Sequence, residues 1–339
     1  MNKSKQKIPL SDFDYVLPRE LIGQKPIKPR DHARLLILDK DSGRIEHKHF
    51  FDLPKILKRG DVLVFNDSKV IPARLFGTKE TGGKVEIFLL KNEGKNIWQC
   101  IIGGKVKVGQ KIKLAGKIEA EIVSFGNEKI KSVKFNCSDK KLLTLGETPL
   151  PPYIKNKSKL EDYQTVYAKK EGSVAAPTAG LHFTKKLLSQ LKKMGVQIEY
   201  VTLHVGLGTF EPVKSENILE HKIHSEFAII DKKTAERLNK AKAEGRRIIS
   251  VGTTSTRTLE AFASHKKLIS DSKWVNIFIY PGYEFKFIDG MITNFHLPKS
   301  SLVMLVSALA GSDKIKKVYK EAVNKKYKFY SFGDGMLIR

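Results

Sequence analysis

Cysteines and long hydrophobic runs are both scarce in this sequence. Two cysteines, Cys100 and Cys137, among 339 residues cannot build a disulfide framework, which is typical of a protein kept in a reducing cytosol. The longest apolar run, Leu302 to Ala310, is too short to span a bilayer and predicts a buried helix. The first eight residues are polar and no apolar segment follows them, so we expect no signal peptide, no membrane partner and a cytoplasmic protein.

Acidic residues are also few relative to basic ones. The chain has 36 Asp and Glu against 62 Lys and Arg, a formal net charge of +26. Such an excess predicts a polyanionic partner, most simply nucleic acid. A lysine-rich proteome would produce the same composition, so charge alone leaves open whether the excess is functional.

Two kinds of pattern divide the chain. Between residues 71 and 150, strand-like runs recur without helical periodicity and are separated by turns such as Gly94-Lys95, which predicts a small antiparallel barrel or sandwich. Residues 1–70 and 151–339 alternate strands with helices, which is typical of a layered α/β domain. We therefore expect a mixed α/β fold, with a discontinuous catalytic main domain that contains an inserted β domain.

The least charged loops flank a single predicted helix, Thr184 to Met194. Residues Ser173 to His182 and His204 to Thr209 are small and almost uncharged, in a chain that is 29% charged. Small side chains at the ends of strands and helices let the backbone approach a ligand closely. Tight packing between layers would explain the same composition, and the spacing does not decide between the two.

Polar residues follow two predicted strands. Gly252 to Thr256 lies between a strand and a helix predicted to begin near Arg257, where free N–H groups and hydroxyls could hold a phosphate or carboxylate. One Ser or Thr would be needed there as a helix cap in any case, and Arg257 would add a charged fork. Asn66 and Asp67 follow the apolar run Val62 to Phe65, a place that suits either a ligand contact or an Asx turn. A further strand is predicted over residues 276–280.

Three of the nine histidines, His182, His204 and His296, stand in apolar or glycine-rich segments. An imidazole exchanges protons near neutral pH, which makes each a candidate for acid–base catalysis. A lone histidine of this kind is more often a hydrogen-bonded core residue, and the sequence leaves both possibilities open. Glu226 is a carboxylate candidate in a comparable place. No cysteine or HExxH spacing accompanies the histidines, so we expect no metal site.

Several blocks of the sequence exceed what chance similarity explains. In chain order they are GDVLVFNDSKVIPARL, LGETPLPPYI, GSVAAPTAGLHFT, TLHVGLGTFEPV, HKIHSEF, VGTTSTRTLE, IYPGYEFKFIDGMITNFHLPKSSLVMLVSALAG and YSFGDGMLI. From about Asp12 to the C-terminus, the chain resembles the S-adenosylmethionine:tRNA ribosyltransferase-isomerases of queuosine biosynthesis. The resemblance implies a β-barrel inserted in a mixed α/β domain.

The resemblance also implies an activity. The ribosyl moiety of S-adenosylmethionine would be transferred to 7-aminomethyl-7-deazaguanine at the wobble position of a tRNA with a GUN anticodon and isomerised, giving epoxyqueuosine-tRNA, adenine and methionine. S-adenosylmethionine is then a cosubstrate, no prosthetic group is expected, and we expect a monomer. A tRNA methyltransferase using the same cosubstrate would need more glycines than Gly206-Leu-Gly208 offers. A non-enzymatic basic RNA-binding protein would explain the charge but not the uncharged loops.

This chemistry requires particular groups. A ribose becomes a carbocycle only if a new C–C bond forms, and the carbon beside the sulfonium is the natural carbanion because the positive sulfur acidifies its protons. A base must take that proton, and an acid should assist the departure of adenine. We predict His182 and His204 as base and acid, in an order left open, with Glu226 behind them. The predicted substrate-binding residues are Asn66, Asp67, Thr178, Gly180, Gly206, Gly208, Thr253, Thr254, Ser255, Arg257, Asn294 and His296.

Overall fold

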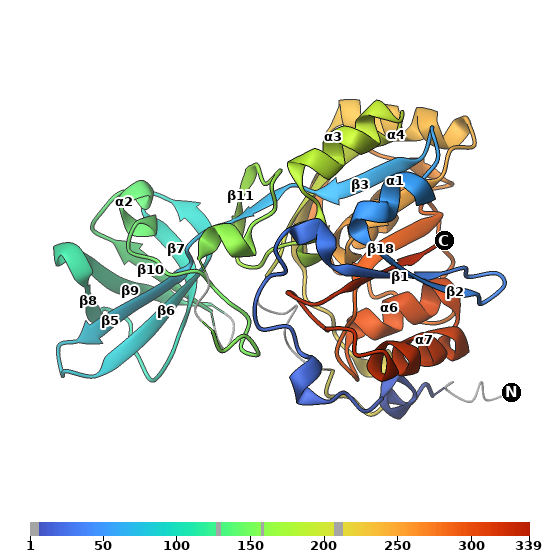
Figure 1. Ribbon diagram of the computed structural model, residues 1–339. Coiled ribbons are helices and arrows are strands. Elements are labelled where there is room, and N and C mark those ends of the chain that lie inside the picture. The colour runs from blue at the N-terminus through green and yellow to red at the C-terminus, as the bar shows by residue number, and fades with distance from the viewer. Residues whose placement is uncertain (1–6, 127–129, 157–158, 207–212) are drawn as a thin grey trace, which may run out of the picture.

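The computed structural model describes residues 7–126, 130–156, 159–206 and 213–339. Figure 1 shows two lobes, a β-barrel on the left and a layered α/β part on the right, with β11 (Lys170–Ser173) between them. The mixed α/β fold with an inserted antiparallel barrel is therefore confirmed. In the described ranges, no helix combines the length and the apolar composition needed to cross a membrane.

The layered part is built on a mixed sheet of nine strands in the order β17-β13-β12-β3-β14-β18-β19-β1-β2. Their bounds are β1 Arg34–Leu38, β2 Ile45–His49, β3 Val62–Asn66, β12 Gln197–His204, β13 Glu226–Ile230, β14 Ile248–Val251, β17 Asp271–Val275, β18 Gly290–Asn294 and β19 Gly335–Ile338. Strand β3 is parallel to β12 and β14, and β14 is parallel to β18. The carboxyl ends of these four strands therefore lie together, at what we call the carboxyl edge of the sheet.

Helices cover both faces of this sheet. In β1, Leu35 and Ile37 join one hydrophobic core while Leu36 and Leu38 join the other, as expected where side chains alternate across a sheet buried on both faces. One core includes side chains of α1 (Leu53–Ile56) and α3 (Lys185–Lys193). The other core includes side chains of α4 (Lys232–Ala243), α5 (Thr253–Phe262), α6 (Ser301–Ala310) and α7 (Ser312–Asn324).

The barrel closes in the order β10-β7-β6-β5-β8-β9, with β9 paired to β10, so these strands have no free edge. Its strands are β5 Arg74–Lys79, β6 Lys84–Gly94, β7 Ile97–Ile102, β8 Lys111–Leu114, β9 Glu119–Phe125 and β10 Ile130–Phe135. The remaining elements are β4 (Ser68–Val70), paired with β11, the helix α2 (Asp139–Leu143), and the short pair β15 (Ala263–Ser264) and β16 (Lys267–Leu268). The barrel strands fall within residues 71–150, but the domain boundaries themselves stay a prediction.

Local signals explain which predicted elements form. Helix α3 begins where predicted, because the Thr184 hydroxyl accepts a hydrogen bond from the backbone N–H of Leu187 at 3.0 Å. The predicted start of α5 near Arg257 is wrong: Gly252, with φ of 89°, caps the helix, which begins at Thr253. The strand predicted over residues 276–280 is also wrong, and β17 lies just before it. As an exposed edge strand, β17 lacks the apolar alternation by which strands are predicted.

Candidate active site

The carboxyl edge gathers most of the predicted site residues. Asn66, His204 and Asn294 are the last residues of β3, β12 and β18. Asp67 follows β3, Gly206 lies just beyond β12, Gly252–Thr254 follow β14, and His296 lies just beyond β18. Because β13 runs antiparallel to β12, its first residue, Glu226, lies at the same edge. In open α/β sheets this is the edge at which ligands bind.

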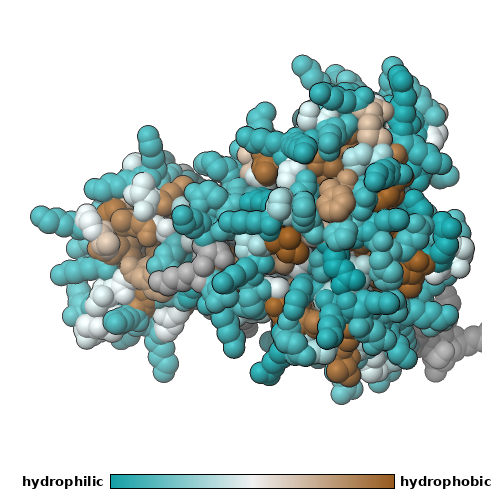
Figure 2. Space-filling model, in the orientation of Figure 1, coloured by the Kyte–Doolittle hydropathy of each residue, from teal (hydrophilic) through white to brown (hydrophobic). Residues whose placement is uncertain are grey.

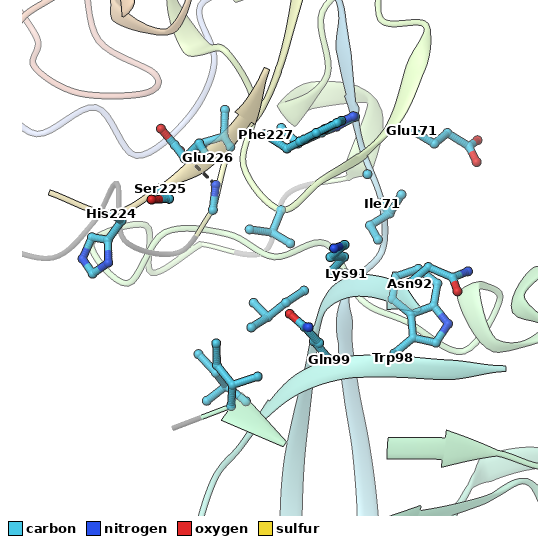
Figure 3. A pocket seen from close by; sticks show the side chains of 18 of the residues that line it. Ile71, Lys91, Asn92, Trp98, Gln99, Glu171, His224, Ser225, Glu226 and Phe227 are labelled. Carbon is cyan, nitrogen blue, oxygen red and sulfur yellow. Dashed lines mark hydrogen bonds between the residues drawn. The ribbon is translucent and has the colours of Figure 1, made fainter. Parts of the chain in front are cut away.

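A cleft of about 1180 Å³ lies between this edge and the barrel. Figure 3 shows Glu226 and Phe227 of the sheet on one side, and Lys91, Trp98 and Gln99 of the barrel on the other. His204 and Gly206 also line the cleft. A Cβ on Gly206 would meet no described atom within 4 Å, so backbone is open to a ligand at this point.

Two smaller cavities adjoin the cleft. Val205 lines both the cleft and a cavity of about 90 Å³, which we call the polar cavity. Glu226 lines both the cleft and a cavity of about 30 Å³. Thr253 and Thr254, at the start of α5, line both small cavities. The three spaces therefore adjoin one another along the carboxyl edge, and we treat them as one site.

Four buried polar atoms surround the polar cavity without a well-formed hydrogen bond to the described residues, although Ser331 lies near Tyr163 and His182 lies near Asn294. They are Tyr163 Oη, Thr254 Oγ1, Asn294 Oδ1 and Tyr330 Oη, which we call the polar cluster. Leaving a buried polar group unpaired costs about 1–3 kcal/mol. Four such groups around one cavity indicate that a polar ligand, or water held in its place, completes them. The predicted residues Thr178 and His296 line the same cavity.

A buried ion pair fixes the inner wall of the cleft. The side chains of Arg257 and Glu226 are 9% and 3% exposed, and Arg257 Nη1 donates to Glu226 Oε2. The backbone N–H of Gly206 donates to Glu226 Oε1 at 3.0 Å. A buried charge needs such partners to offset its desolvation. Glu226 thus presents a fixed carboxylate between the cleft and the cavity of about 30 Å³.

His204 lies at the end of β12 and lines the cleft. Burial lowers its pKa, and the nearby Asp67 carboxylate only partly offsets this. Its Nδ1 is packed beside Gly172, where an added Cβ would approach to 3.0 Å. The ring is therefore neutral at neutral pH and able to accept a proton. Asp67 accepts a hydrogen bond from Thr202 Oγ1 at 2.6 Å, and burial raises the pKa of its carboxyl.

His182 is separated from His204. It ends the short helix η7 (Thr178–His182), is 4% exposed, and stacks on Phe50 with ring centroids 4.2 Å apart. Burial lowers its pKa to about 4, although Asn294 lies near enough to raise it in part. His182 lines a cavity of about 20 Å³ together with Ser331, which also lines the polar cavity. His182 therefore lies behind the polar cluster, and the structure does not bring the two predicted catalytic histidines together.

His296 is also deeply buried. Its Nε2 is 3.0 Å from the Thr293 hydroxyl, its backbone N–H donates to Tyr319 Oη at 3.1 Å, and burial lowers its pKa to about 3. Burial therefore holds the ring neutral in the wall of the polar cavity, and the two hydrogen bonds fix its position. They favour a role in shaping that wall over proton transfer.

Three of the predicted ligand-binding residues also have structural contacts. The Asn66 side chain donates to the Leu203 carbonyl at 2.9 Å and accepts from the Leu203 N–H at 3.0 Å, which joins β3 to β12. The Ser255 hydroxyl donates to the Val251 carbonyl at 2.9 Å. A Cβ on Gly180 would lie 1.8 Å from Tyr167 Oη, so packing accounts for this glycine. Gly208 lies outside the described residues.

Two residues of the polar cluster, Tyr163 and Tyr330, are missing from the sequence-based set. Tyr330 opens the block YSFGDGMLI, which could have drawn attention to it. Tyr330 precedes β19 (Gly335–Ile338), which runs antiparallel to β18 and pairs its first residue, Gly335, with Asn294. The segment before β19 therefore lies at the carboxyl edge, where Tyr330 lines the polar cavity. No group of three or more His, Cys, Asp or Glu side chains in the described part of the chain is arranged to hold a metal ion.

The fold and the site define an α/β enzyme whose catalytic edge faces an inserted β-barrel. The family model described as "Queuosine biosynthesis protein" matches residues 10–338. The chain is 50% identical over 331 residues to an S-adenosylmethionine:tRNA ribosyltransferase-isomerase of Thermosipho melanesiensis, covering 97% of this chain and 99% of that one. It is 53% identical over 336 residues to one of Carboxydothermus hydrogenoformans, with the same coverage.

A solved structure is similar as well. It is that of S-adenosylmethionine tRNA ribosyltransferase from Thermotoga maritima, with 39% identity, a TM-score of 0.58, and coverage of 97% of this chain and 100% of that one. The chain therefore belongs to the S-adenosylmethionine:tRNA ribosyltransferase-isomerase family of queuosine biosynthesis, as its sequence blocks indicate.

Proposed function

We propose that this enzyme acts in the cytoplasm, as a monomer without a prosthetic group, on tRNA with a GUN anticodon that carries 7-aminomethyl-7-deazaguanine. It transfers the ribosyl moiety of S-adenosylmethionine to that base and isomerises it, giving epoxyqueuosine-tRNA, adenine and methionine. The observation that best supports this proposal is the site itself, in which a wide cleft for a nucleotide adjoins a small cavity lined by the polar cluster.

The amino-acid end of S-adenosylmethionine suits the polar cavity. Its carboxylate and ammonium are compact and polar, and they would complete the hydrogen bonds of the polar cluster. Thr253 and Thr254 place the start of α5 at the same cavity, and the N-terminus of a helix favours a negative group. The sulfonium would then lie toward the buried Glu226–Arg257 ion pair.

His204 suits the role of general base. It lines the cleft with its pKa lowered, so its imidazole is neutral and can take a proton from the carbon beside the sulfonium. His182, with a pKa of about 4, is unprotonated at neutral pH and lies behind the polar cavity. We propose that His182 positions Asn294 and that adenine departs with the help of another group.

Mass spectrometry of tRNA nucleosides tests the proposed reaction directly. The enzyme is incubated with S-adenosylmethionine and tRNA carrying 7-aminomethyl-7-deazaguanine. We expect a ribosyl-derived addition at the wobble nucleoside, together with free adenine and methionine. A methyl addition would indicate a methyltransferase, and an unchanged mass would indicate an RNA-binding protein without this activity. Either result would contradict the proposal.

The polar cluster predicts a specific effect of Thr254→Val. Because the Thr254 hydroxyl has no bonded partner in the described residues, the similarly shaped valine should leave the free energy of unfolding nearly unchanged. The affinity for S-adenosylmethionine should fall by about 1–3 kcal/mol, the cost of losing a hydrogen bond to a charged group. Calorimetry measures the affinity, and thermal unfolding measures the stability.

Ser255→Ala is the matched control for Thr254→Val. Its hydroxyl is bonded to the Val251 carbonyl inside α5, so its loss should affect stability more than ligand affinity. If Thr254→Val binds S-adenosylmethionine with unchanged affinity, the polar cavity is not the site that binds its amino-acid end.

The net charge of +26 predicts strongly salt-dependent tRNA binding. Hydrophilic side chains cover most of the face seen in Figure 2, and hydrophobic ones form separate patches. Phosphates neutralised by Lys and Arg release counterions, so affinity should fall steeply as salt rises from about 50 to 200 mM, by roughly 10³-fold for six phosphate contacts. Filter binding at several salt concentrations measures the slope. A flat response would mean that the charge is only compositional.

A further inference from the structure

Three aromatic rings lie side by side on adjacent strands along the wall of the cleft. His204 of β12 is opposite Phe227 of β13, and Phe227 is opposite Trp274 of β17. Directly opposed residues of antiparallel strands share a face of the sheet. The His204 and Phe227 rings are nearly parallel, 4° apart with centroids 6.4 Å apart, and the Phe227 and Trp274 centroids are 5.6 Å apart. All three line the cleft.

Trp274 is the outermost and most exposed of these rings. It is 53% exposed although it is the largest of the apolar side chains, and β17 is the edge strand of the sheet. Burial in the core therefore does not account for it. From His204 to Trp274 the row crosses two strand spacings, roughly 10 Å. The row thus runs from the proposed base, His204, which is partly buried, to the exposed Trp274 at the edge of the sheet.

The barrel supplies a cation opposite this ring. Lys91 Nζ of β6 lies 5.2 Å from the centre of the Trp274 ring, and both residues line the cleft. An aromatic face beside a lysine is the combination that binds single-stranded nucleic acid, since bases stack on the ring and phosphates pair with the cation.

We propose that Trp274 is the stacking platform for the unpaired anticodon-loop base next to the target base, with Lys91 of the barrel as the opposing contact to the RNA backbone. Single-stranded loops are recognised by bases splayed onto aromatic side chains. The target base then enters the cleft past Phe227 toward His204 while its neighbour is held on Trp274. Trp274 is thus a positioning residue for tRNA, and this inference rests on the proposed function.

Fluorescence provides a direct test, because the chain has only two tryptophans, Trp98 and Trp274. In Trp98→Phe, the emission comes from Trp274 alone, and a stacked base should quench it. The probe is a synthetic anticodon stem-loop with 7-aminomethyl-7-deazaguanine at the wobble position, added without S-adenosylmethionine. In Trp274→Phe, the remaining Trp98 lines the cleft but is only 5% exposed, so its emission should be quenched less than that of Trp274 in Trp98→Phe. If Trp98→Phe does not fold, the comparison of the wild type with Trp274→Phe still measures the quenching of Trp274.

Kinetics separates positioning from a general loss of structure. In Trp274→Ala, KM for tRNA should rise roughly 5- to 150-fold, which corresponds to the loss of about 1–3 kcal/mol of base stacking. Trp274→Phe retains a ring and should raise it less. KM for S-adenosylmethionine, and kcat at saturating tRNA, should stay near the wild-type values in both variants.

Phe76→Ala is the matched control. Phe76 is 50% exposed and has Arg74 above its ring at 5.1 Å, but it lines a separate groove on the barrel. KM for tRNA should be unchanged in this variant. Binding of the stem-loop without quenching of Trp274, or an equal rise of KM in Phe76→Ala, would overturn the inference. Either of these results would leave the proposed function intact. The proposed function is contradicted by a different result, the absence of the ribosyl-derived product in mass spectrometry.

Discussion

A His204→Gln variant should turn over at least about a hundredfold more slowly than the wild type at saturating tRNA and S-adenosylmethionine, the scale of losing a general base. Glutamine retains some hydrogen bonding but cannot exchange a proton near neutral pH. The affinity for S-adenosylmethionine should change much less, because the lost interaction belongs to the transition state. Single-turnover kinetics and calorimetry measure the two quantities.

The pH profile gives this prediction a second readout. Because burial lowers the pKa of His204, kcat/KM should rise with pH through a value below the ordinary 6.5 and then level off. That acidic limb should be missing in His204→Gln. His265→Gln is the matched control, since His265 is exposed and bonded to its neighbour Ser264. Normal turnover in His204→Gln, or a loss of activity that only parallels a loss of thermal stability, would remove His204 from the mechanism.

The positions at the carboxyl edge could be predicted from sequence because each buried strand is apolar and ends in a small or polar residue. Asn66 follows one such run, His204 ends another, and Gly252 follows a third. The pattern of apolar runs and polar ends does not give the order of the strands in the sheet. Only the parallel pairing of β3 with β12 and β14 brings these three ends together. Without that order, His182 and His204 look equivalent, although one lies behind the polar cavity and the other lines the cleft.

The sequence also does not show in which direction a side chain points. Thr254 and Ser255 are neighbours of similar chemistry, yet the first hydroxyl lies at the polar cavity and the second is bonded within α5. A helix turns by about 100° per residue, so adjacent residues point to different surroundings. Trp274 was not predicted as a site residue for another reason. It lies on β17, an exposed edge strand that lacks the apolar alternation by which strands are predicted from sequence.

Acidification should destabilise the protein, and His296 should account for a large part of the effect. Burial lowers the pKa of His296 to about 3 and that of His182 to about 4. In the unfolded chain both would titrate near 6.5. The unfolded state therefore binds more protons, so stability is fully present above pH 6.5 and is lost as pH falls below it. Each histidine should cost up to about 1.4 kcal/mol per pH unit, or roughly 2 kcal/mol at pH 5.

Urea unfolding between pH 7.5 and 5 measures this loss as the slope of the free energy of unfolding against pH. In His296→Gln this slope should be shallower by the contribution of one histidine, because glutamine does not titrate. This holds even if the variant is less stable than the wild type at pH 7.5. Asp67 and Asp334, whose pKa values are raised by burial, act in the opposite direction, but they do so equally in both proteins. If His296→Gln and the wild type have equal slopes, His296 is not held neutral in the folded protein, and the wall of the polar cavity carries a charge that this structure does not account for.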